Sequence, residues 1–330
     1  MTTKPANAWH EAPSEALYNN VGNEVDRLYG LEDYGAAYDL LEATWPGVPD
    51  REMDPGMQDP LQFKAYLLAR LGRAPETLDV VRAMHRVGYA CGLSWSAFDA
   101  LRGLDGYEEA ARENDRLIAE AQRDARLEID VVTPPTYDSS VPAPLAILLH
   151  GDGENMENLK GFWRPEAMLE RGFVVAYLQS SQLVFTRKFA WLPDPAVAWK
   201  DVQTAHQQLV SDYTIDPSRL LLCGFSGGAI TAVDLVFGEA LPATGFISLC
   251  PEILPAHFDA ASAARAADRG VRGVFIEGAL VWPLDDEQTM VDVMKQAGVP
   301  LEILLNEGYG HAAPPDFDQK LRQALDFVLG

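Results

Sequence analysis

The pattern of apolar and polar positions changes near residue 126 and divides the chain into two halves. Residues 1–126 read almost entirely as helix, whereas residues 127–330 alternate short apolar runs with helical stretches. In the second half we predict strands at Leu127–Val132, Leu145–His150, Phe173–Gln179, Leu220–Gly224, Gly245–Cys250, Val274–Gly278 and Leu301–Leu305. Helices are predicted between and after them at Pro195–Asp212, Gly228–Phe237, Glu287–Gln296 and Phe317–Val328.

Several of these strands are continuous apolar runs, as expected where helices cover both faces of a sheet. Strand–helix alternation therefore predicts an α/β domain with a doubly wound, mostly parallel sheet over residues 127–330. In such sheets the chemistry gathers at the carboxyl ends of the strands. Residues 1–126 predict a small all-helical domain that precedes it.

A weak repeat runs through the helical half. Each unit has a leucine, a short polar or glycine-bearing turn, and then small and apolar residues that open a helix, as in Leu31–Tyr38, Leu71–Leu78 and Leu104–Ala111. The spacing resembles tetratricopeptide-like helical hairpins, although it is irregular and the signature Trp and Pro positions are missing. Such a half could pack against the sheet, cover the site as a lid, or bind a protein partner.

Composition and charge narrow the choice of partners. Hydrophobic residues make up 48% of the chain and charged residues 23%, which is typical of a globular protein with a real core. The formal net charge of -23 argues against nucleic-acid binding, which depends on Lys and Arg, and against docking on an anionic membrane. The acidity is explained most simply by solubility.

The three cysteines, Cys91, Cys223 and Cys250, form no CxxC pair, so neither a zinc site nor a disulfide framework is indicated. The first 18 residues contain no apolar segment typical of a secretory signal. No apolar run approaches the roughly 18 residues needed to span a bilayer. We therefore expect a cytoplasmic protein with no membrane association.

The segment Leu220–Ile230 carries the strongest chemical signal, because it places Gly224-Phe225-Ser226-Gly227-Gly228 between an apolar strand and an amphipathic helix. A sharp strand-to-helix turn of this kind puts the serine in a strained backbone conformation. Side chains two positions away on either side would collide, which explains the two outer glycines. The turn lifts the hydroxyl clear of the sheet, at the positive end of a helix.

On this motif, residues 127–330 resemble an α/β hydrolase, similar to the phospholipase/carboxylesterase and dienelactone-hydrolase branches. A second feature supports the resemblance: the strand ending at Leu149 runs into His150-Gly151-Asp152-Gly153, which resembles the His-Gly oxyanion loop of these families. The resemblance implies that the backbone N–H groups of Asp152 and Gly227 hold the oxyanion of a tetrahedral intermediate. The simpler alternative is that the glycines only make a tight turn.

The last predicted strand leads into Asn306-Glu307-Gly308-Tyr309-Gly310-His311. A histidine in a glycine-rich loop at this place is where the family carries its general base, and an imidazole titrates close to neutral pH. The order of Ser226 before His311 also suits the fold. The other five histidines are placed less well for this role.

The third member of a catalytic triad is missing from its usual place. The family commonly has Gly-x-x-Asp after the strand that ends here at Gly278, but this chain has Val281 at the last position. Asp285 is the favoured replacement, ahead of Glu252, which follows the preceding strand; Asp286 and Glu277 are further candidates. Asp285 could instead cap the helix that follows it. It is also open whether any acid completes the site.

These features predict a serine hydrolase that cleaves a small-molecule carboxylic ester or thioester through an acyl-enzyme. The alternatives are a serine peptidase or amidase on the same fold, and a non-catalytic scaffold whose helical half binds a protein. Val281 is the best support for the scaffold. No cofactor or metal is expected, because the sequence has no dinucleotide or phosphate-binding glycine loop and no clustered metal ligands.

Overall fold

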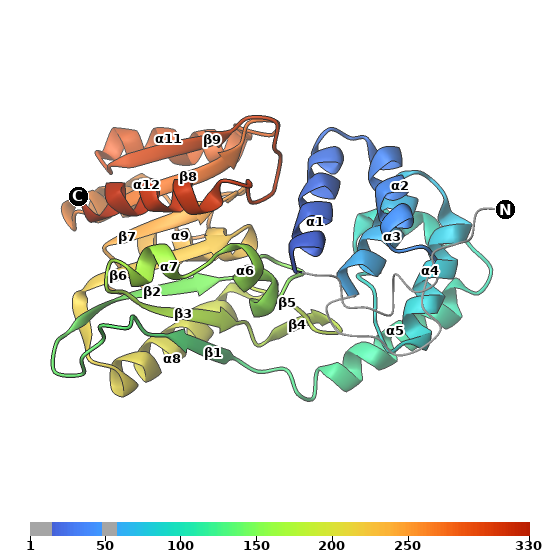
Figure 1. Cartoon of the computed structure of the whole chain (residues 1–330), viewed down its shortest axis with the longest axis horizontal. Helices are drawn as coiled ribbons and strands as arrows, with labels where there is room; N and C mark the ends of the chain where they lie inside the picture. Colours follow the sequence, from blue (N-terminus) through green and yellow to red (C-terminus); the bar gives the residue numbers. More distant parts are fainter. Residues whose placement is uncertain (1–14, 48–57) are drawn as a thin grey trace. The chain divides into compact units, whose positions relative to one another are not determined.

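A computed structural model describes residues 15–47 and 58–330. The chain forms two compact units: a helical unit of residues up to 124 together with 184–186, and a sheet unit of residues 125–183 and 187–330 (Figure 1). The sequence assigned residues 184–186 to the second half, so this short insertion into the helical unit was not foreseen. That the halves are separate domains divided at residue 126 remains a prediction.

The sheet unit is built on seven strands in the order β1-β3-β2-β6-β7-β8-β9. Only β1, at one edge, runs antiparallel to its neighbour; the other pairs are parallel. The predicted mostly parallel sheet is confirmed, and each predicted strand is present. Their bounds are β1 Glu128–Val132, β2 Ala143–Leu149, β3 Val174–Gln179, β6 Ile215–Phe225, β7 Gly245–Leu249, β8 Arg272–Gly278 and β9 Leu301–Asn306.

Helices cover both faces of this sheet (Figure 1). One face packs against α8 (Pro195–Asp212), α9 (Gly227–Phe237), α10 (Ala260–Asp268) and α11 (Asp285–Ala297). The other packs against α6 (Met156–Phe162), α7 (Glu166–Leu169) and α12 (Phe317–Leu329). Successive strand residues alternate between the two cores: Phe275 belongs to the first, and Val274 and Ile276 to the second.

The predicted helices correspond to α8, α9, α11 and α12, and the sequence missed three others. Helix α7 is a single short turn, and α6 and α10 begin at capping boxes formed by Asn155 with Asn158 and by Asp259 with Ser262. A small hairpin of β4 (Gln182–Phe185) and β5 (Lys188–Ala190) was also missed. These elements are short, so their hydrophobic periodicity is too brief to detect.

The helical unit contains two helical hairpins with matching turns among its described residues. Helices α1 (Glu15–Gly30) and α2 (Tyr34–Thr44) form the first, and α3 (Gln58–Arg70) and α4 (Ala74–Arg86) the second. In each turn the central residue, Glu32 or Gly72, has a positive φ, and the next N–H bonds the carbonyl five residues back. The third repeat segment instead follows a short 3-10 helix, η2 (Ser96–Leu101), and precedes α5 (Tyr107–Ala121). The tetratricopeptide-like resemblance is therefore not confirmed.

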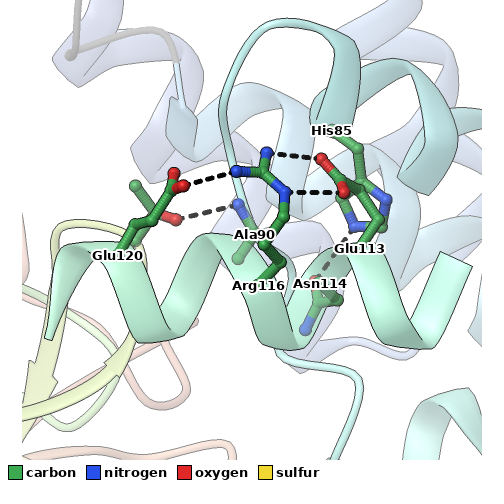
Figure 2. A network of polar contacts seen from close by, with 7 residues as sticks. His85, Ala90, Glu113, Asn114, Arg116 and Glu120 are labelled. Atoms are coloured by element: carbon green, nitrogen blue, oxygen red, sulfur yellow. Dashed lines mark hydrogen bonds and ion pairs between the residues drawn. The ribbon is translucent and has the colours of Figure 1, made fainter.

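A buried asparagine, Asn114, joins α5 to α4 and to the irregular segment that follows α4; Figure 2 shows its contact with His85 of α4. Asn114 accepts hydrogen bonds from the Cys91 N–H at 2.7 Å and from the His85 ring at 3.0 Å, and it donates to the Cys91 carbonyl at 3.1 Å. Next to Cys91, the Ala90 N–H donates to the Thr186 hydroxyl at 3.0 Å, which ties residues 184–186 to this unit. One side chain thus satisfies three buried polar groups.

We expect Asn114→Ala to destabilise the helical unit by roughly 3 kcal/mol, because it orphans both backbone groups of Cys91. Urea unfolding followed by circular dichroism measures the change. The matched control is Arg116→Ala on the same helix, where an exposed arginine pairs with Glu113 and Glu120 (Figure 2). Such exposed pairs contribute little, so the control should unfold like the wild type. An equal loss in both variants would contradict the assignment.

Candidate active site

Three of the residues with predicted roles, Asp152, Ser226 and Glu252, follow the carboxyl ends of three neighbouring strands. Leu149 at the end of β2 lies beside Gly224 of β6, and Phe225 at the end of β6 lies beside Leu249 of β7. The oxyanion loop, Ser226 and Glu252 therefore leave the sheet at the same edge, where parallel sheets gather their chemistry.

Ser226 occupies a sharp turn between β6 and α9. Its φ of 51° and ψ of -120° lie in a region that non-glycine residues rarely adopt, at a cost on the order of 1–3 kcal/mol. The turn is held by the Ser226 N–H, which donates to the Leu249 carbonyl at 2.9 Å, and by the Ser226 carbonyl, which accepts from Ile230. The half-buried side chain sits at the start of α9, where the helix dipole favours negative charge.

The glycines around Ser226 are required by close backbone approach. A Cβ on Gly224 would overlap the backbone of Gly228, and a Cβ on Gly228 would overlap the carbonyl groups of Leu149 and His150. The steric reason given for the motif is present in the structure. The first turn of α9 thus packs directly on the end of β2.

The two residues predicted to bind an oxyanion lie side by side. A Cβ on Gly227 would overlap the Asp152 side chain, so the Gly227 backbone lies directly against that side chain. The Asp152 carboxylate accepts the backbone N–H groups of Trp191 at 2.7 Å and Leu192 at 3.3 Å. Burial raises the pKa of Asp152, and these two hydrogen bonds oppose the rise. The Asp152 side chain is therefore engaged in fixing its own loop.

His150 is fully buried and fixes the peptide that follows it. Its Nδ1 lies 2.8 Å from the Gly151 carbonyl, which can only accept, and its Nε2 receives the Ser180 N–H at 3.2 Å. The ring is thus the neutral Nδ1–H tautomer, and burial lowers its pKa to about 4. The Gly151 carbonyl also accepts the Glu154 N–H. Because the peptide is planar and trans, these bonds aim the Asp152 N–H in the opposite direction.

His311 lies against the residue that precedes Ser226. Its ring centroid is 5.1 Å from that of Phe225, with 36° between the planes. Its Nδ1 is 2.7 Å from Oε1 of Glu252, which is an ion-pair distance, although the ring N–H is turned off the line of an ideal hydrogen bond. A small ring rotation would align the two groups. About a third of each side chain is exposed.

Electrostatics keep Glu252 ionised beside the ring. Burial alone would raise the pKa of its carboxyl, but the short contact with His311 and the charge of that ring outweigh burial and leave the pKa lowered. At neutral pH the carboxylate therefore faces the imidazole as an anion.

The turn that carries Glu252 repeats the geometry of the Ser226 turn on the next strand. Cys250 also has a positive φ, 53°, and its N–H donates to the Ile276 carbonyl of β8 at 3.1 Å. Strained non-glycine residues concentrate where the surrounding structure holds a functional group in place. Here the strain turns the chain so that Glu252 lies over the edge of the sheet.

The loop that carries His311 is anchored to the end of β8. A Cβ on Gly278 would overlap the Gly310 carbonyl, and the Leu280 N–H donates to the Tyr309 carbonyl at 3.0 Å. Gly278, which the sequence marked as the start of a family turn, is thus needed for close packing of the His311 loop. The acid that usually follows it is not there.

The preference for Asp285 over Glu252 does not agree with this geometry. Asp285 is the exposed first residue of α11, whereas Glu252 lies beside the imidazole. The turn after β8 runs directly into α11, which fixes Asp285 in the helix instead of at the ring. The available sequence signal was a carboxylate two residues beyond the strand next to the Ser226 strand. Phe225, which packs on His311, was not singled out from the sequence.

Two further properties bear on possible ligands. Among the described residues, no group of three or more His, Cys, Asp or Glu side chains could hold a metal ion. Across the same part of the chain, none of the helices has the length and apolar character required to cross a bilayer.

No family model matches the chain, and no curated protein matches it. An uncharacterized protein from Bacillus cereus ATCC 10987 is similar at 21% identity, over 94% of this chain and 98% of that one, with a TM-score of 0.50. A Bacillus cereus carboxylesterase matches at 18% identity, over 64% and 98%, with a TM-score of 0.49. A butyrate-bound esterase from Thermogutta terrifontis matches at 16%, over 64% and 91%, with a TM-score of 0.46.

The similarity to the uncharacterized Bacillus cereus protein shows a common fold and nothing about activity. The order of the strands, the single antiparallel edge strand and the helices on both faces give the sheet unit the α/β-hydrolase fold. Fold does not determine function, so the function is argued from the geometry of the site.

We expect Gly228→Ala to destabilise the sheet unit by at least about 3 kcal/mol, because the added methyl meets rigid backbone carbonyls. The control is Gly161→Ala in α6, where no atom lies within 4 Å of the added group. A helical glycine replaced by alanine in open space should gain about 0.5 kcal/mol. Urea midpoints of both variants test the difference. A Gly228→Ala variant as stable as the wild type would rule out the close approach.

Proposed function

We propose that the sheet unit is a serine hydrolase that cleaves a carboxylic ester or thioester, with Ser226 as nucleophile, His311 as general base and Glu252 as the orienting acid. One observation carries the proposal: the His311 ring lies between the residue that precedes Ser226 and a carboxylate 2.7 Å from its Nδ1. In support, these contacts bring His311 next to the turn that carries Ser226 and next to Glu252, although the three residues are far apart in the sequence.

In the proposed reaction the Ser226 hydroxyl oxygen attacks the substrate carbonyl carbon while Nε2 of His311 takes the hydroxyl proton. Nδ1 faces Glu252, so Nε2 is the nitrogen left for this transfer. The carboxylate stabilises the imidazolium. The imidazolium of His311 then gives its proton to the leaving alcohol or thiol as the C–O or C–S bond breaks. Water, deprotonated by His311, then attacks the acyl-serine. As this second tetrahedral intermediate collapses, His311 returns the proton to the Ser226 oxygen, which frees the acid and restores the hydroxyl.

The oxyanion of each tetrahedral intermediate would be held by the backbone N–H groups of Asp152 and Gly227. The close approach of these residues and the fixed orientation of the Gly151–Asp152 peptide support this role. The N–H at Gly227, the first residue of α9, belongs to the group of helix N–H donors that lack intrahelical partners. Loss of one such donor typically costs a factor of about 10² to 10³ in rate.

Apolar side chains beside the site favour an uncharged, apolar substrate group. Ile253 and Leu254 follow Glu252 directly, and Leu280 and Leu284 lie in the loop after β8; each is more than a third exposed. The Leu254 N–H donates to Asp286 at 3.1 Å, which joins the two loops. These four residues, the apolar rim, would contact an acyl or alkyl chain.

We expect Ser226→Ala to lower the turnover of p-nitrophenyl butyrate by about 10⁴-fold or more, because the nucleophile is lost. Wild-type protein should react with a fluorophosphonate probe, and the variant should not. The control is Ser218→Ala on the same strand, where an exposed serine donates hydrogen bonds to Asp216 two residues before it. Probe labelling that survives in Ser226→Ala would refute the nucleophile.

The same assay separates the rival functions. Faster cleavage of a peptide or anilide than of its matched ester would make the protein an amidase or peptidase. Absence of both probe labelling and turnover in the wild type would leave a non-catalytic scaffold.

We expect Glu252→Gln to lower kcat by about 10³ to 10⁴-fold, as loss of the orienting carboxylate does in serine triads. Asp285→Asn removes the same charge from an exposed position and should leave kcat unchanged. Steady-state kinetics on one ester, with circular dichroism to verify folding, tests the pair. The reverse ranking would return the acid to Asp285.

A further inference from the structure

We propose that Glu277 holds a proton at neutral pH, shares it with Glu287, and through that pair positions the loop that carries Glu252. In this arrangement Glu277 acts on catalysis through other residues, so it is a positioning residue. The effect of Glu277 on turnover rests on the proposed function, whereas the protonation of Glu277 is independent of it.

The two glutamates are fully buried and face each other. Both side chains have no exposed surface. Glu277 follows Ile276 in β8 and shares the sheet face of Phe275, which is the face covered by α11. Glu287 lies in the first turn of that helix, and its side chain is within hydrogen-bonding range of Glu277. The strand and helix thus bring two carboxyl groups into one apolar space.

The oxygen atoms of this pair show where the proton belongs. Oε2 of Glu287 accepts the Leu284 N–H at 2.8 Å. Both oxygens of Glu277 and Oε1 of Glu287 have no hydrogen-bond partner among the described residues. Two carboxylates can only accept, so as anions they would leave three buried oxygens unsatisfied and two like charges together. One proton between them supplies the missing donor.

The surrounding charges assign this proton to Glu277. Its neighbours are Glu287 on α11, Glu252 on the loop after β7, and Cys250 at the end of β7. Burial, followed by the charge of Glu287, raises the pKa of Glu277 well above its ordinary value, and the smaller opposing contribution of the Cys250 thiol does not cancel the rise. Burial also raises the pKa of Glu287, but the Leu284 N–H, the bond from Glu277 and the charge of His311 oppose that rise. Glu287 is therefore the better anion.

The pair is connected to Glu252 through the start of α11. Glu287 accepts the N–H of Leu284, the N-cap residue, and so fixes the first turn of the helix. The neighbouring Asp286 accepts the Leu254 N–H at 3.1 Å, which holds the loop two residues after Glu252. The donor on Glu277 thus supports the helix end that in turn holds the catalytic loop.

Protonation is tested first without any assay of activity. Glu277→Gln keeps the shape and a donor but cannot ionise. Infrared spectra at neutral pH should show the C=O stretch of a protonated carboxyl in the wild type and not in this variant. Glu307→Gln, which removes an exposed glutamate from the His311 loop, is the matched control and should keep the band.

Stability against pH gives a second readout with a definite sign. A carboxyl whose folded pKa is raised contributes stability below its unfolded pKa of 4.5, and that contribution is lost as pH rises. The folding equilibrium constant of the wild type should therefore fall relative to Glu277→Gln between about pH 5 and 8, by up to about tenfold per pH unit. A ratio that does not change with pH, or the missing infrared band, would overturn the proposal.

Kinetics test the positioning role. Glu277→Leu removes the donor and should lower kcat by about tenfold, because the start of α11 and the Glu252 loop lose their support. Glu277→Gln should restore most of this loss, since its amide N–H donates to Glu287. If Glu277→Gln is as defective as Glu277→Leu, then Glu277 acts as an anion and the positioning role is wrong. An inactive wild type would instead refute the hydrolase while leaving the infrared and stability results interpretable.

Discussion

The site depends on the close approach of the first turn of α9 to the end of β2. At Gly228 the helix backbone meets the carbonyl groups of Leu149 and His150, and no side chain fits between them. This contact sets the sharp turn at Ser226 and places Gly227 beside Asp152. The strained serine conformation is therefore held by packing on both sides.

A strained turn that bonds the neighbouring strand occurs at two successive strands of the sheet, β6 and β7. The Ser226 N–H donates to the last residue of β7, and the Cys250 N–H donates to Ile276 of β8. Each strained residue thus prolongs the parallel hydrogen-bond ladder by one position before its chain turns away. The helical-unit network around Asn114 shows the other solution, in which a side chain supplies the bonds that irregular backbone cannot make itself.

Features of the fold could be predicted from the sequence where a local pattern of residues is itself their physical cause. Continuous apolar runs revealed the strands, and the steric need for Gly224 and Gly228 identified the Ser226 turn. The identity of the acid is not predictable in this way, because it depends on which loop lies next to the His311 ring in space. Asp285 follows the expected strand, but it is the first residue of α11 and is exposed there, while Glu252 reaches the ring from the loop after the neighbouring strand. No spacing rule could rank these two carboxylates.

Residues 184–186 belong to the helical unit for a related reason. Their partners, such as Ala90, lie in the helical unit and about a hundred positions away in sequence, and a single hydroxyl makes the bond. Similarly, the third repeat segment, Leu104–Ala111, resembles the first two in sequence. It follows a 3-10 helix and not an α-helix, so it does not form a third hairpin. A turn motif predicts a turn; the elements on either side decide what the turn connects.

The ionisable groups of the site are either fully buried and neutral or partly exposed to solvent. His150 and Glu277 have no exposed surface, and each avoids a buried charge by remaining neutral: His150 by lacking a proton and Glu277, in our proposal, by keeping one. His311 and Glu252 instead keep about a third of each side chain in solvent. A base that gains and loses a proton in each cycle needs that access, because full desolvation would penalise the imidazolium that forms. The neutral groups can lie beneath it and hold backbone in place without adding charge that opposes the reaction.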